Sequence, residues 1–403
     1  MDRRGFVKLA AASPALASPI YAGGSDSSLD GDASGTVIGS PSLDSQTPFT
    51  FYSPLAEQWY RAGQYFEWTS TTRNNEGRQV NVFYRTFGNR SNPALVIFHG
   101  YYRHSFDFRE LIPFLEEDYF VAILDFPGFG FSDKPQDGYS YMIEDDAKLM
   151  DYFVREIVGL SRFQFLTHDR GGSVGFAFLG NYMASEEKEY EITYHFISNG
   201  GLYQPLLNFG GQIDFLHPVR GPEMTRERQA RPRVTKGTPE QVANADILAF
   251  NDGVGAQLHV GKYQLERTVK QYRWLDNLRK SPVPTALMWG VQDTPNPVRI
   301  ANHIWYNYLD RRSVESSFWL LPAGHSPHRD TAEEMAGIVR TCLEVGIPAP
   351  EDENVFMREL ARNRTATSPV YVGRTIVEDL YYESTTRIDF PGSIEYSPDG
   401  YPF

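Results

Sequence analysis

Three polar side chains of this sequence stand at or shortly after the ends of short apolar segments, and together they could carry out a two-step hydrolysis. Asp169 ends the run that begins at Phe163, Asp293 comes shortly after Trp289-Gly290, and His325 follows Ala323-Gly324. A carboxylate is ionised at neutral pH, so Asp169 could attack a saturated carbon without the help of a base and form an ester. His325, oriented by Asp293, would then deprotonate the water that hydrolyses this ester.

A second nucleophile is available in the same region, because Gly171-Gly172-Ser173-Val174-Gly175 matches G-x-S-x-G, the pattern of serine esterases and lipases. If Ser173 were the nucleophile, the preceding strand would run through Asp169 and Arg170 and would place two charged residues inside a central strand. We therefore favour Asp169 and keep a serine esterase or lipase that uses Ser173 as the alternative. His328 lies close to His325, and the Gly324-His325 pair favours the earlier histidine.

These residues need a sheet to bring them together, and the sequence predicts one. Several of the predicted strands are almost wholly apolar, as strands covered on both faces of a parallel sheet must be. Helical patterns alternate with them, which predicts a doubly wound α/β fold whose first two strands form an antiparallel edge. The predicted strands are Tyr65–Ser70, Gln79–Thr86, Ala94–His99, Phe120–Asp125, Phe163–Asp169, Thr193–Ser198, Thr285–Gly290 and Ser317–Leu321.

The strand pattern stops between residues 200 and 282, and we interpret this segment as a helical insertion, or cap, after the sixth strand. Thr238-Pro239-Glu240-Gln241 has the N-cap, the first-turn proline and the capping-box glutamine of a helix start. A second helix is predicted over about 262–280. Insertions at this place lie over the carboxyl ends of the strands, where open α/β sheets bind ligands.

Four segments give the sequence a resemblance to a known family. They are His99-Gly100, the run from Asp125 to Asp133, His168-Asp169-Arg170-Gly171-Gly172, and Gly324-His325. In this order they resemble the aspartate-nucleophile branch of the α/β-hydrolases, which contains epoxide hydrolases and haloalkane and haloacetate dehalogenases.

The resemblance covers roughly residues 62–346 and implies an α/β-hydrolase fold. Its mostly parallel, doubly wound sheet would have eight strands and a helical cap after strand 6. The core would comprise residues 51–199 and 283–346, with the cap at 200–282. The family layout also implies that the backbone N–H groups of Tyr101 and Arg170 hold the oxyanion.

The resemblance does not extend to one subfamily. Haloalkane dehalogenases usually carry a tryptophan after the nucleophile to hold the halide, and this position is Arg170 here. Haloacetate dehalogenases have an arginine there that pairs with the substrate carboxylate. They also have a second arginine shortly downstream, and this sequence has none at that place. Epoxide hydrolases use cap tyrosines to protonate the opening ring, and the cap supplies Tyr203, Tyr263 and Tyr272. We therefore favour epoxide opening over dehalogenation, with Tyr263, Tyr272 and Trp274 as candidate substrate contacts.

Composition and motifs exclude other classes of function. The chain has 38 Lys and Arg against 51 Asp and Glu and a net charge of −13, which argues against nucleic acid and anionic lipid as partners. The single cysteine, Cys342, excludes an intramolecular disulfide. Gly128-Phe129-Gly130 lacks the third glycine of a dinucleotide site, and no histidine spacing suits zinc. We predict no metal and no organic cofactor, and a small molecule as the partner.

The two ends of the chain are predicted to lie outside the core. Arg3-Arg4-Gly5-Phe6-Val7-Lys8, followed by an apolar stretch, resembles a twin-arginine export signal. We expect a signal peptide over 1–22, a flexible linker over 23–50, a periplasmic or secreted protein, and no stable membrane anchor after cleavage. Residues 347–403 form an extension with possible strands at Val370–Val372, Thr375–Ile376 and Arg387–Phe390. This extension keeps open a third hypothesis, a binding protein without catalysis on a hydrolase fold.

Overall fold

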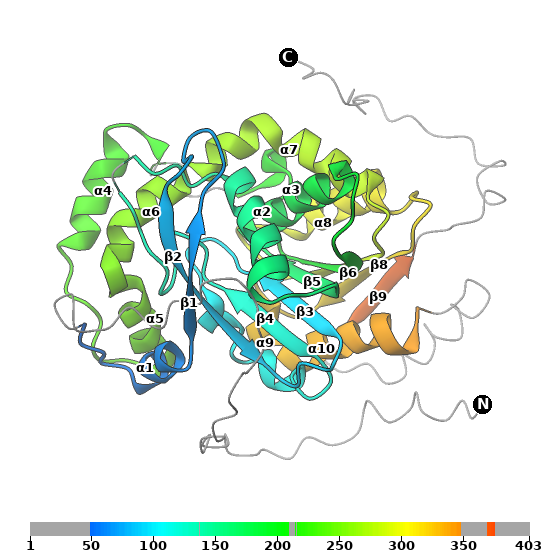
Figure 1. Ribbon diagram of the computed structural model, residues 1–403, viewed down its shortest axis with the longest axis horizontal. Coiled ribbons are helices and arrows are strands. Elements are labelled where there is room, and N and C mark those ends of the chain that lie inside the picture. Colours follow the sequence, from blue (N-terminus) through cyan, green and yellow to red (C-terminus); the bar gives the residue numbers. More distant parts are fainter. Residues whose placement is uncertain (1–48, 137, 209–213, 215, 348–368, 375–403) are drawn as a thin grey trace.

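The computed structural model describes residues 49–347, apart from 137, 209–213 and 215, and residues 369–374. Within these residues nine strands form one sheet in the order β1-β2-β4-β3-β5-β6-β7-β8-β9. Figure 1 shows the twisted sheet with helices on both of its faces. The strands are β1 (Gln64–Thr69), β2 (Gln79–Phe87), β3 (Ala94–Phe98), β4 (Phe120–Leu124), β5 (Arg162–His168), β6 (Glu191–Ser198), β7 (Thr285–Gly290), β8 (Ser316–Leu321) and β9 (Val370–Arg374).

The central strands are buried on both faces because apolar side chains point to each side. In β3 all five residues are buried; Val96 and Phe98 belong to one core cluster, while Leu95 and Ile97 belong to the other. Helices α2, α3, α7 and α8 supply the first cluster, and α1, α5 and α10 the second. The helices are α1 (Pro54–Arg61), α2 (Ile143–Tyr152), α3 (Arg170–Ala184), α4 (Arg220–Gln229), α5 (Pro239–Ala249), α6 (Gly253–Gly261), α7 (Tyr263–Lys280), α8 (Val298–Ile304), α9 (Pro327–Asp330) and α10 (Ala332–Arg340).

The predicted α/β-hydrolase fold is confirmed, and the eight predicted strands are all present. Strands β3 to β8 pair in parallel, and β1 pairs with β2 in the antiparallel sense, as expected. Because parallel strands end at the same edge of a sheet, the residues after β3, β5, β6, β7 and β8 meet there. This edge carries the candidate site.

The predicted count of eight strands was wrong by one strand. Residues Val370–Arg374 form β9, which pairs antiparallel with β8 and covers the edge that β8 would otherwise expose. Tyr371 is fully buried there, and its ring lies 4.8 Å from that of Trp319. The possible strand at Val370–Val372 is thus real, whereas those at Thr375–Ile376 and Arg387–Phe390 fall outside the described residues.

The segment between β6 and β7 contains α4, α5, α6 and α7, which Figure 1 shows gathered beside the sheet. The helix start predicted at Thr238 is confirmed. Its side chain accepts a hydrogen bond from the N–H of Gln241, whose side chain bonds back to the N–H of Thr238. The helix predicted over 262–280 is α7. Helices α5, α6 and α7 supply residues to one wall of the cavity described below.

The N-terminal boundary differs from the prediction. Phe49 and Thr50 were assigned to a linker, but the ring of Phe49 packs 5.3 Å from that of Phe250, and the Thr50 carbonyl accepts a hydrogen bond from Arg233. Helix α1, which the sequence analysis did not predict, follows with Ser53 as its N-cap. The predicted export signal lies outside the described residues and stays a prediction. Within the described part of the chain, no helix has both the length and the apolar character to span a bilayer.

Candidate active site

Asp169 lies at a sharp turn between β5 and α3. Its backbone has φ 51° and ψ −115°, a conformation that costs an L residue with a side chain of the order of 1–3 kcal/mol. The turn is close-packed, since a Cβ atom added to Gly171 would lie 2.3 Å from the carbonyl oxygen of Phe98. A Cβ atom on Gly100 would lie 2.7 Å from Cβ of Asp169. The two glycines therefore allow the strained turn, which lifts the Asp169 carboxylate above the end of the sheet.

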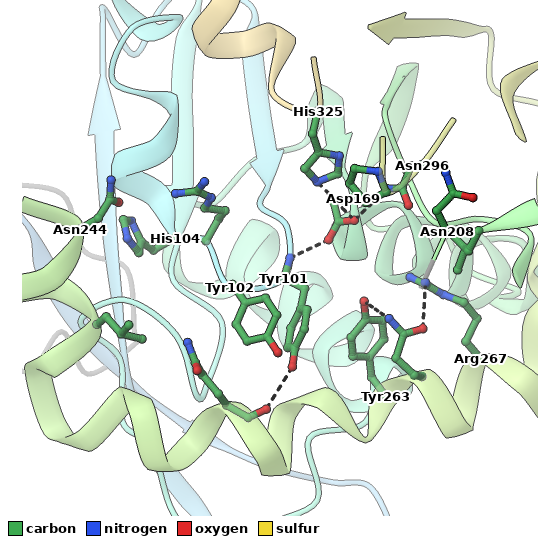
Figure 2. A pocket seen from close by; sticks show the side chains of 16 residues that line it. Tyr101, Tyr102, His104, Asp169, Asn208, Asn244, Tyr263, Arg267, Asn296 and His325 are labelled. Carbon is green, nitrogen blue, oxygen red and sulfur yellow. Dashed lines mark hydrogen bonds and ion pairs between the residues drawn. The ribbon is translucent and has the colours of Figure 1, made fainter. Parts of the chain in front are cut away.

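The two carboxylate oxygens of Asp169 have different partners. Oδ1 accepts a hydrogen bond of 2.8 Å from the backbone N–H of Tyr101, which comes from the loop after β3. Oδ2 accepts a hydrogen bond of 3.1 Å from Nδ2 of Asn296 and lies 3.7 Å from Nε2 of His325 (Figure 2). One oxygen is thus held by the backbone, whereas the other faces the imidazole.

His325 and Asp293 form a hydrogen-bonded pair beside Asp169. Nδ1 of His325 lies 2.9 Å from Oδ2 of Asp293, so Nε2 is the ring nitrogen that faces Asp169. Asp293 is buried, and its oxygens also accept hydrogen bonds from Nδ2 of Asn199 at 2.7 Å and from the N–H of Asn296 at 2.9 Å. These donors fix the Asp293 carboxylate and, through it, the orientation of the imidazole.

The environment raises the pKa of His325 above its ordinary value of 6.5. Burial is the largest single influence and lowers the pKa. The hydrogen bond to Asp293 and the negative charges of Asp169 and Asp293 raise it and together outweigh burial. Any reaction that neutralises Asp169 would remove one of these raising influences.

A cavity of about 320 Å³ opens in front of the Asp169 carboxylate, which is at the small end of the range for ligand sites. Figure 2 shows side chains from the sheet edge and from the cap converging on it. Its lining residues are Tyr101, Tyr102, Arg103, His104, Asp169, Leu207, Asn208, Asn244, Leu248, Gln257, Tyr263, Gln264, Arg267, Pro295, Asn296 and His325. The cavity can take a small molecule and place it against the carboxylate.

The substrate-contacting residues predicted on α7 are only partly brought to this cavity. Tyr263 is buried and lines it, and its hydroxyl accepts a hydrogen bond of 2.8 Å from Nε2 of Gln264. Tyr272 does not line it and packs against Tyr203 instead. Trp274 does not line it either, because it is buried in the core and its indole N–H donates to Glu144. The expectation that Trp274 contacts the substrate therefore does not fit its position.

The side chain of Arg170 also lies away from the cavity. It is buried and forms an ion pair of 2.6 Å with Asp146, and its guanidinium lies 5.3 Å from the centre of the Phe129 ring. Asp146 belongs to α2, so this pair joins α2 to the start of α3. The Arg170 side chain is therefore not available to a substrate carboxylate, and its predicted oxyanion role concerns only its backbone N–H.

Ser173 has surroundings that differ from those of Asp169. It lies in the first turn of α3, since β5 ends at His168, and it is buried without lining the cavity. Its Oγ accepts hydrogen bonds of 3.2 and 3.0 Å from Nε and Nη2 of Arg267. Among the hydrogen bonds of the described residues, none joins Ser173 to a histidine, as a serine nucleophile requires.

His328, the neighbour of His325, is part of the core. Its Nε2 lies 2.8 Å from Oδ2 of Asp107, and its ring stacks on Phe108 at 4.2 Å. It is fully buried and does not line the cavity. Both histidines are bonded to a buried aspartate, but only His325 lines the cavity.

Sequence reasoning missed two asparagines that hold the site together. Asn199 follows β6 directly, and a polar residue at the carboxyl end of an apolar strand was a usable signal. Asn296 is three residues after Asp293 in a proline-rich turn, and nothing local distinguishes it from other turn residues. Arg267 was missed because α7 also carries Arg273 and Arg279, and nothing in the sequence shows which of the three faces the site.

In the described part of the chain, no group of three or more His, Cys, Asp or Glu side chains is placed to ligate a metal ion.

Comparisons with known sequences place this chain among hydrolases. A family model described as the alpha/beta hydrolase fold matches residues 93–188, which include β3 to β5 and all of α3. LipZ of Mycobacterium tuberculosis, which is named as a hydrolase, is 28% identical over 297 residues, or 70% of this chain and 96% of LipZ. The soluble epoxide hydrolase of Corynebacterium sp. strain C12 is 37% identical over 91 residues, or 22% of this chain and 30% of that enzyme.

Solved structures resemble this one in fold. The haloalkane dehalogenase DbeA of Bradyrhizobium elkani matches with a TM-score of 0.54 and 16% identity, covering 69% of this chain and 97% of DbeA. The protein lip1 of Acinetobacter baumannii, described as a lipase, matches with a TM-score of 0.55 and 17% identity, covering 75% of this chain and 98% of lip1. Since dehalogenases and lipases match equally well, the fold does not select a nucleophile, and the site geometry must do so.

Proposed function

Because the chain is an enzyme with the α/β-hydrolase fold, we propose that it hydrolyses a small organic substrate through a covalent ester on Asp169. One observation carries this proposal: the Asp169 carboxylate projects into the cavity from the strained turn with Nε2 of His325 at 3.7 Å. The Ser173 hydroxyl, by contrast, is held by Arg267 outside the cavity.

In the first step, Oδ2 of Asp169 attacks a carbon of the substrate while the bond from that carbon to its leaving group breaks. Oδ1 becomes the carbonyl oxygen of the new ester. Its hydrogen bond from the N–H of Tyr101 places it where a tetrahedral intermediate would develop negative charge in the second step. Asn296 Nδ2, bonded to Oδ2, sets the direction of attack.

We favour an epoxide as the reacting group because Tyr263 lies in the cavity. Burial raises the pKa of Tyr263 and outweighs the positive charge of Arg267, which lowers it. The phenol therefore stays protonated at neutral pH. Its only described hydrogen bond is one that its oxygen accepts, so the proton can be donated to the oxygen of the opening ring. The proton that His325 later removes from water balances this donation and restores the phenol.

In the second step, Nε2 of His325 takes a proton from water, and the resulting hydroxide attacks the ester carbonyl. Asp293 stabilises the imidazolium that forms. Formation of the ester removes the negative charge of Asp169, and this lowers the pKa of His325 when a neutral base is required. The tetrahedral intermediate then collapses as the bond between the carboxyl carbon and Oδ2 breaks. The proton of the newly added hydroxyl passes to the departing oxygen, so the product leaves as an alcohol and the Asp169 carboxylate is regenerated.

Activity on a panel of terminal epoxides, primary haloalkanes and short-chain nitrophenyl esters tests the proposal. We expect diol formation from epoxides as the fastest reaction. Halide release without diol formation would keep the aspartate mechanism and change the leaving group. Ester cleavage without either reaction, lost on the change Ser173→Ala, would replace the proposal by a serine esterase.

The change Tyr263→Phe should slow epoxide opening by about 100-fold, because the alkoxide would then form on the opened ring without a proton donor. Single-turnover kinetics should show the loss in ester formation and not in ester hydrolysis. Tyr272→Phe is the matched control, since this tyrosine is on the same helix but outside the cavity. Equal rates of ester formation in wild type and Tyr263→Phe would exclude Tyr263 as the donor.

The change Asp293→Asn should move the acidic limb of the pH profile of kcat to lower pH. The neutral amide could not supply the negative charge that raises the pKa of His325, so the imidazole would stay neutral to lower pH than in wild type. The maximal rate should fall by a factor of about 10² to 10⁴, because the imidazolium loses its counter-ion. Rates measured from roughly pH 5 to 9 would show both effects. An acidic limb at the same pH as in wild type would contradict the pairing.

A further inference from the structure

Arg267 is a second charged group at the cavity, and the mechanism above does not use it. It lies on α7 one helical turn after Tyr263, lines the cavity and is 1% exposed. Figure 2 shows its guanidinium beside Asn208 and Tyr263, at the side of the cavity away from His104 and Asn244. An arginine at such a depth needs partners for its charge as well as for its N–H groups.

The described partners of Arg267 are all uncharged. Nε and Nη2 donate to Oγ of Ser173, Nη1 donates to Oε1 of Gln264 at 3.3 Å, and the guanidinium lies 4.8 Å from the centre of the Tyr263 ring. A guanidinium has five N–H donors, so three hydrogen bonds leave two donors for another acceptor. Among the ion pairs within 4.0 Å in the described residues, none includes Arg267.

The other deeply buried arginines have either a carboxylate or a larger set of acceptors. Arg312 has no carboxylate partner among the described residues, but it donates five hydrogen bonds to side-chain and backbone oxygens. Arg170 has the carboxylate. It is as deeply buried as Arg267, at 1% exposed, but has a carboxylate partner at 2.6 Å in Asp146. A buried charge without a counter-ion is costly, and the cost falls when an anion is brought to it. Arg267 faces the substrate cavity, so the anion can come with the substrate.

We propose that the substrate carries a carboxylate and that Arg267 binds it. The planar guanidinium presents paired N–H donors that match the two oxygens of a carboxylate. Ser173 and Gln264 act as positioning residues, because their oxygens hold the guanidinium in its orientation. With Asp169 and Tyr263 at the reacting end, the cavity of about 320 Å³ takes a short molecule with a carboxylate at one end and the reacting group at the other.

The assignment of the reacting group rests on the proposed function, but binding of the carboxylate does not. Binding is therefore tested without turnover, by titration calorimetry with butyrate. Wild-type protein should bind butyrate, and Arg267→Met should bind it at least about 30-fold more weakly, as expected when one partner of a buried charge pair is removed. Arg273→Met is the control. It removes the same charge from an exposed position on the same helix and should bind butyrate as wild type does.

Turnover supplies the second readout. Wild type should prefer a terminal epoxide with a carboxylate to the corresponding methyl ester. The measure is the kcat/KM for the carboxylate divided by the kcat/KM for the methyl ester, and Arg267→Met should lower this ratio by about 100-fold. Arg267→Lys should restore part of it, since lysine keeps the charge and loses the paired donors. Methionine is apolar and similar in length, so the thermal unfolding midpoint of Arg267→Met should not fall below that of wild type. If Arg267→Met is unfolded, the same ratio measured for Arg267→Lys tests the proposal: a value below that of wild type supports it, and a value equal to that of wild type overturns it.

The results separate the two claims. Butyrate binding by wild type and its loss in Arg267→Met, with no ester on Asp169, would keep the carboxylate site and overturn the nucleophile. Equal butyrate affinity in wild type and Arg267→Met, or an unchanged ratio of kcat/KM, would overturn the carboxylate site and leave the nucleophile standing.

Discussion

The change Asp169→Asn should lower kcat/KM by about 10⁴-fold or more, because an amide has no charge with which to attack a saturated carbon. Asparagine has nearly the same shape and can keep the hydrogen bond from the N–H of Tyr101 through its amide oxygen. The protein should therefore stay folded, and a thermal unfolding midpoint near that of wild type would assign the loss to chemistry. Steady-state rates on the preferred epoxide would measure it.

Ser173→Ala is the matched control for this experiment. Ser173 is four residues further on, in the first turn of α3, and bonds to Arg267 without lining the cavity. Its loss should cost less than about 10-fold, since it removes one neutral acceptor from a group that orients substrate. If Ser173→Ala lost activity and Asp169→Asn kept it, the protein would be a serine hydrolase and the aspartate mechanism would be wrong.

The change His325→Gln should separate the two steps. Ester formation needs only the Asp169 carboxylate and should continue, while ester hydrolysis loses its base and should slow by about 10³- to 10⁴-fold. Mixing the variant with excess epoxide should therefore consume about one equivalent of substrate per enzyme and then stall. Rapid-quench measurement of substrate loss would show this burst.

His328→Gln is the control for the histidine change. His328 is fully buried and bonded to Asp107, so its replacement should lower the thermal unfolding midpoint without producing a burst. A burst in His328→Gln together with steady turnover in His325→Gln would show that His328, and not His325, is the base.

The fold could be predicted from the sequence because local patterns and burial point the same way. β3 is apolar throughout, and only a strand covered on both faces of a sheet buries every side chain. The helix start at Thr238 could be predicted because its capping contacts lie within four residues. β9 was harder, because Val370–Arg374 is defined by its pairing with a distant strand and has little pattern of its own.

The candidate site was predictable where topology alone brings residues together. Asp169, Asp293 and His325 each follow a parallel strand, so their proximity follows from the sheet. The contacts of Arg267 depend instead on how α7 lies across α3, which no local pattern records. Asn296 likewise reaches Asp169 from another loop.

The direction of α7 explains the substrate contacts that were misplaced. Tyr263 and Arg267 are four residues apart and share the face toward the cavity. Trp274 returns to a similar angle three turns later, about 16 Å along the axis, where it meets α2 and not the cavity. Tyr272 is rotated by about half a turn from Tyr263. The spacing of residues along α7 predicts which of them share a face of the helix. It does not predict how far along that face the cavity extends.

The mass of one tryptic peptide tests the central claim most directly. Cleavage at Arg162, Arg170 and Lys188 puts Asp169 in the peptide 163–170 and Ser173 in the peptide 171–188, so trypsin separates the two candidate nucleophiles. After His325→Gln protein is incubated with an epoxide that wild type hydrolyses, the peptide 163–170 should gain the mass of the epoxide. An unmodified peptide 163–170 would contradict an ester on Asp169, and a gain on 171–188 would assign the nucleophile to Ser173.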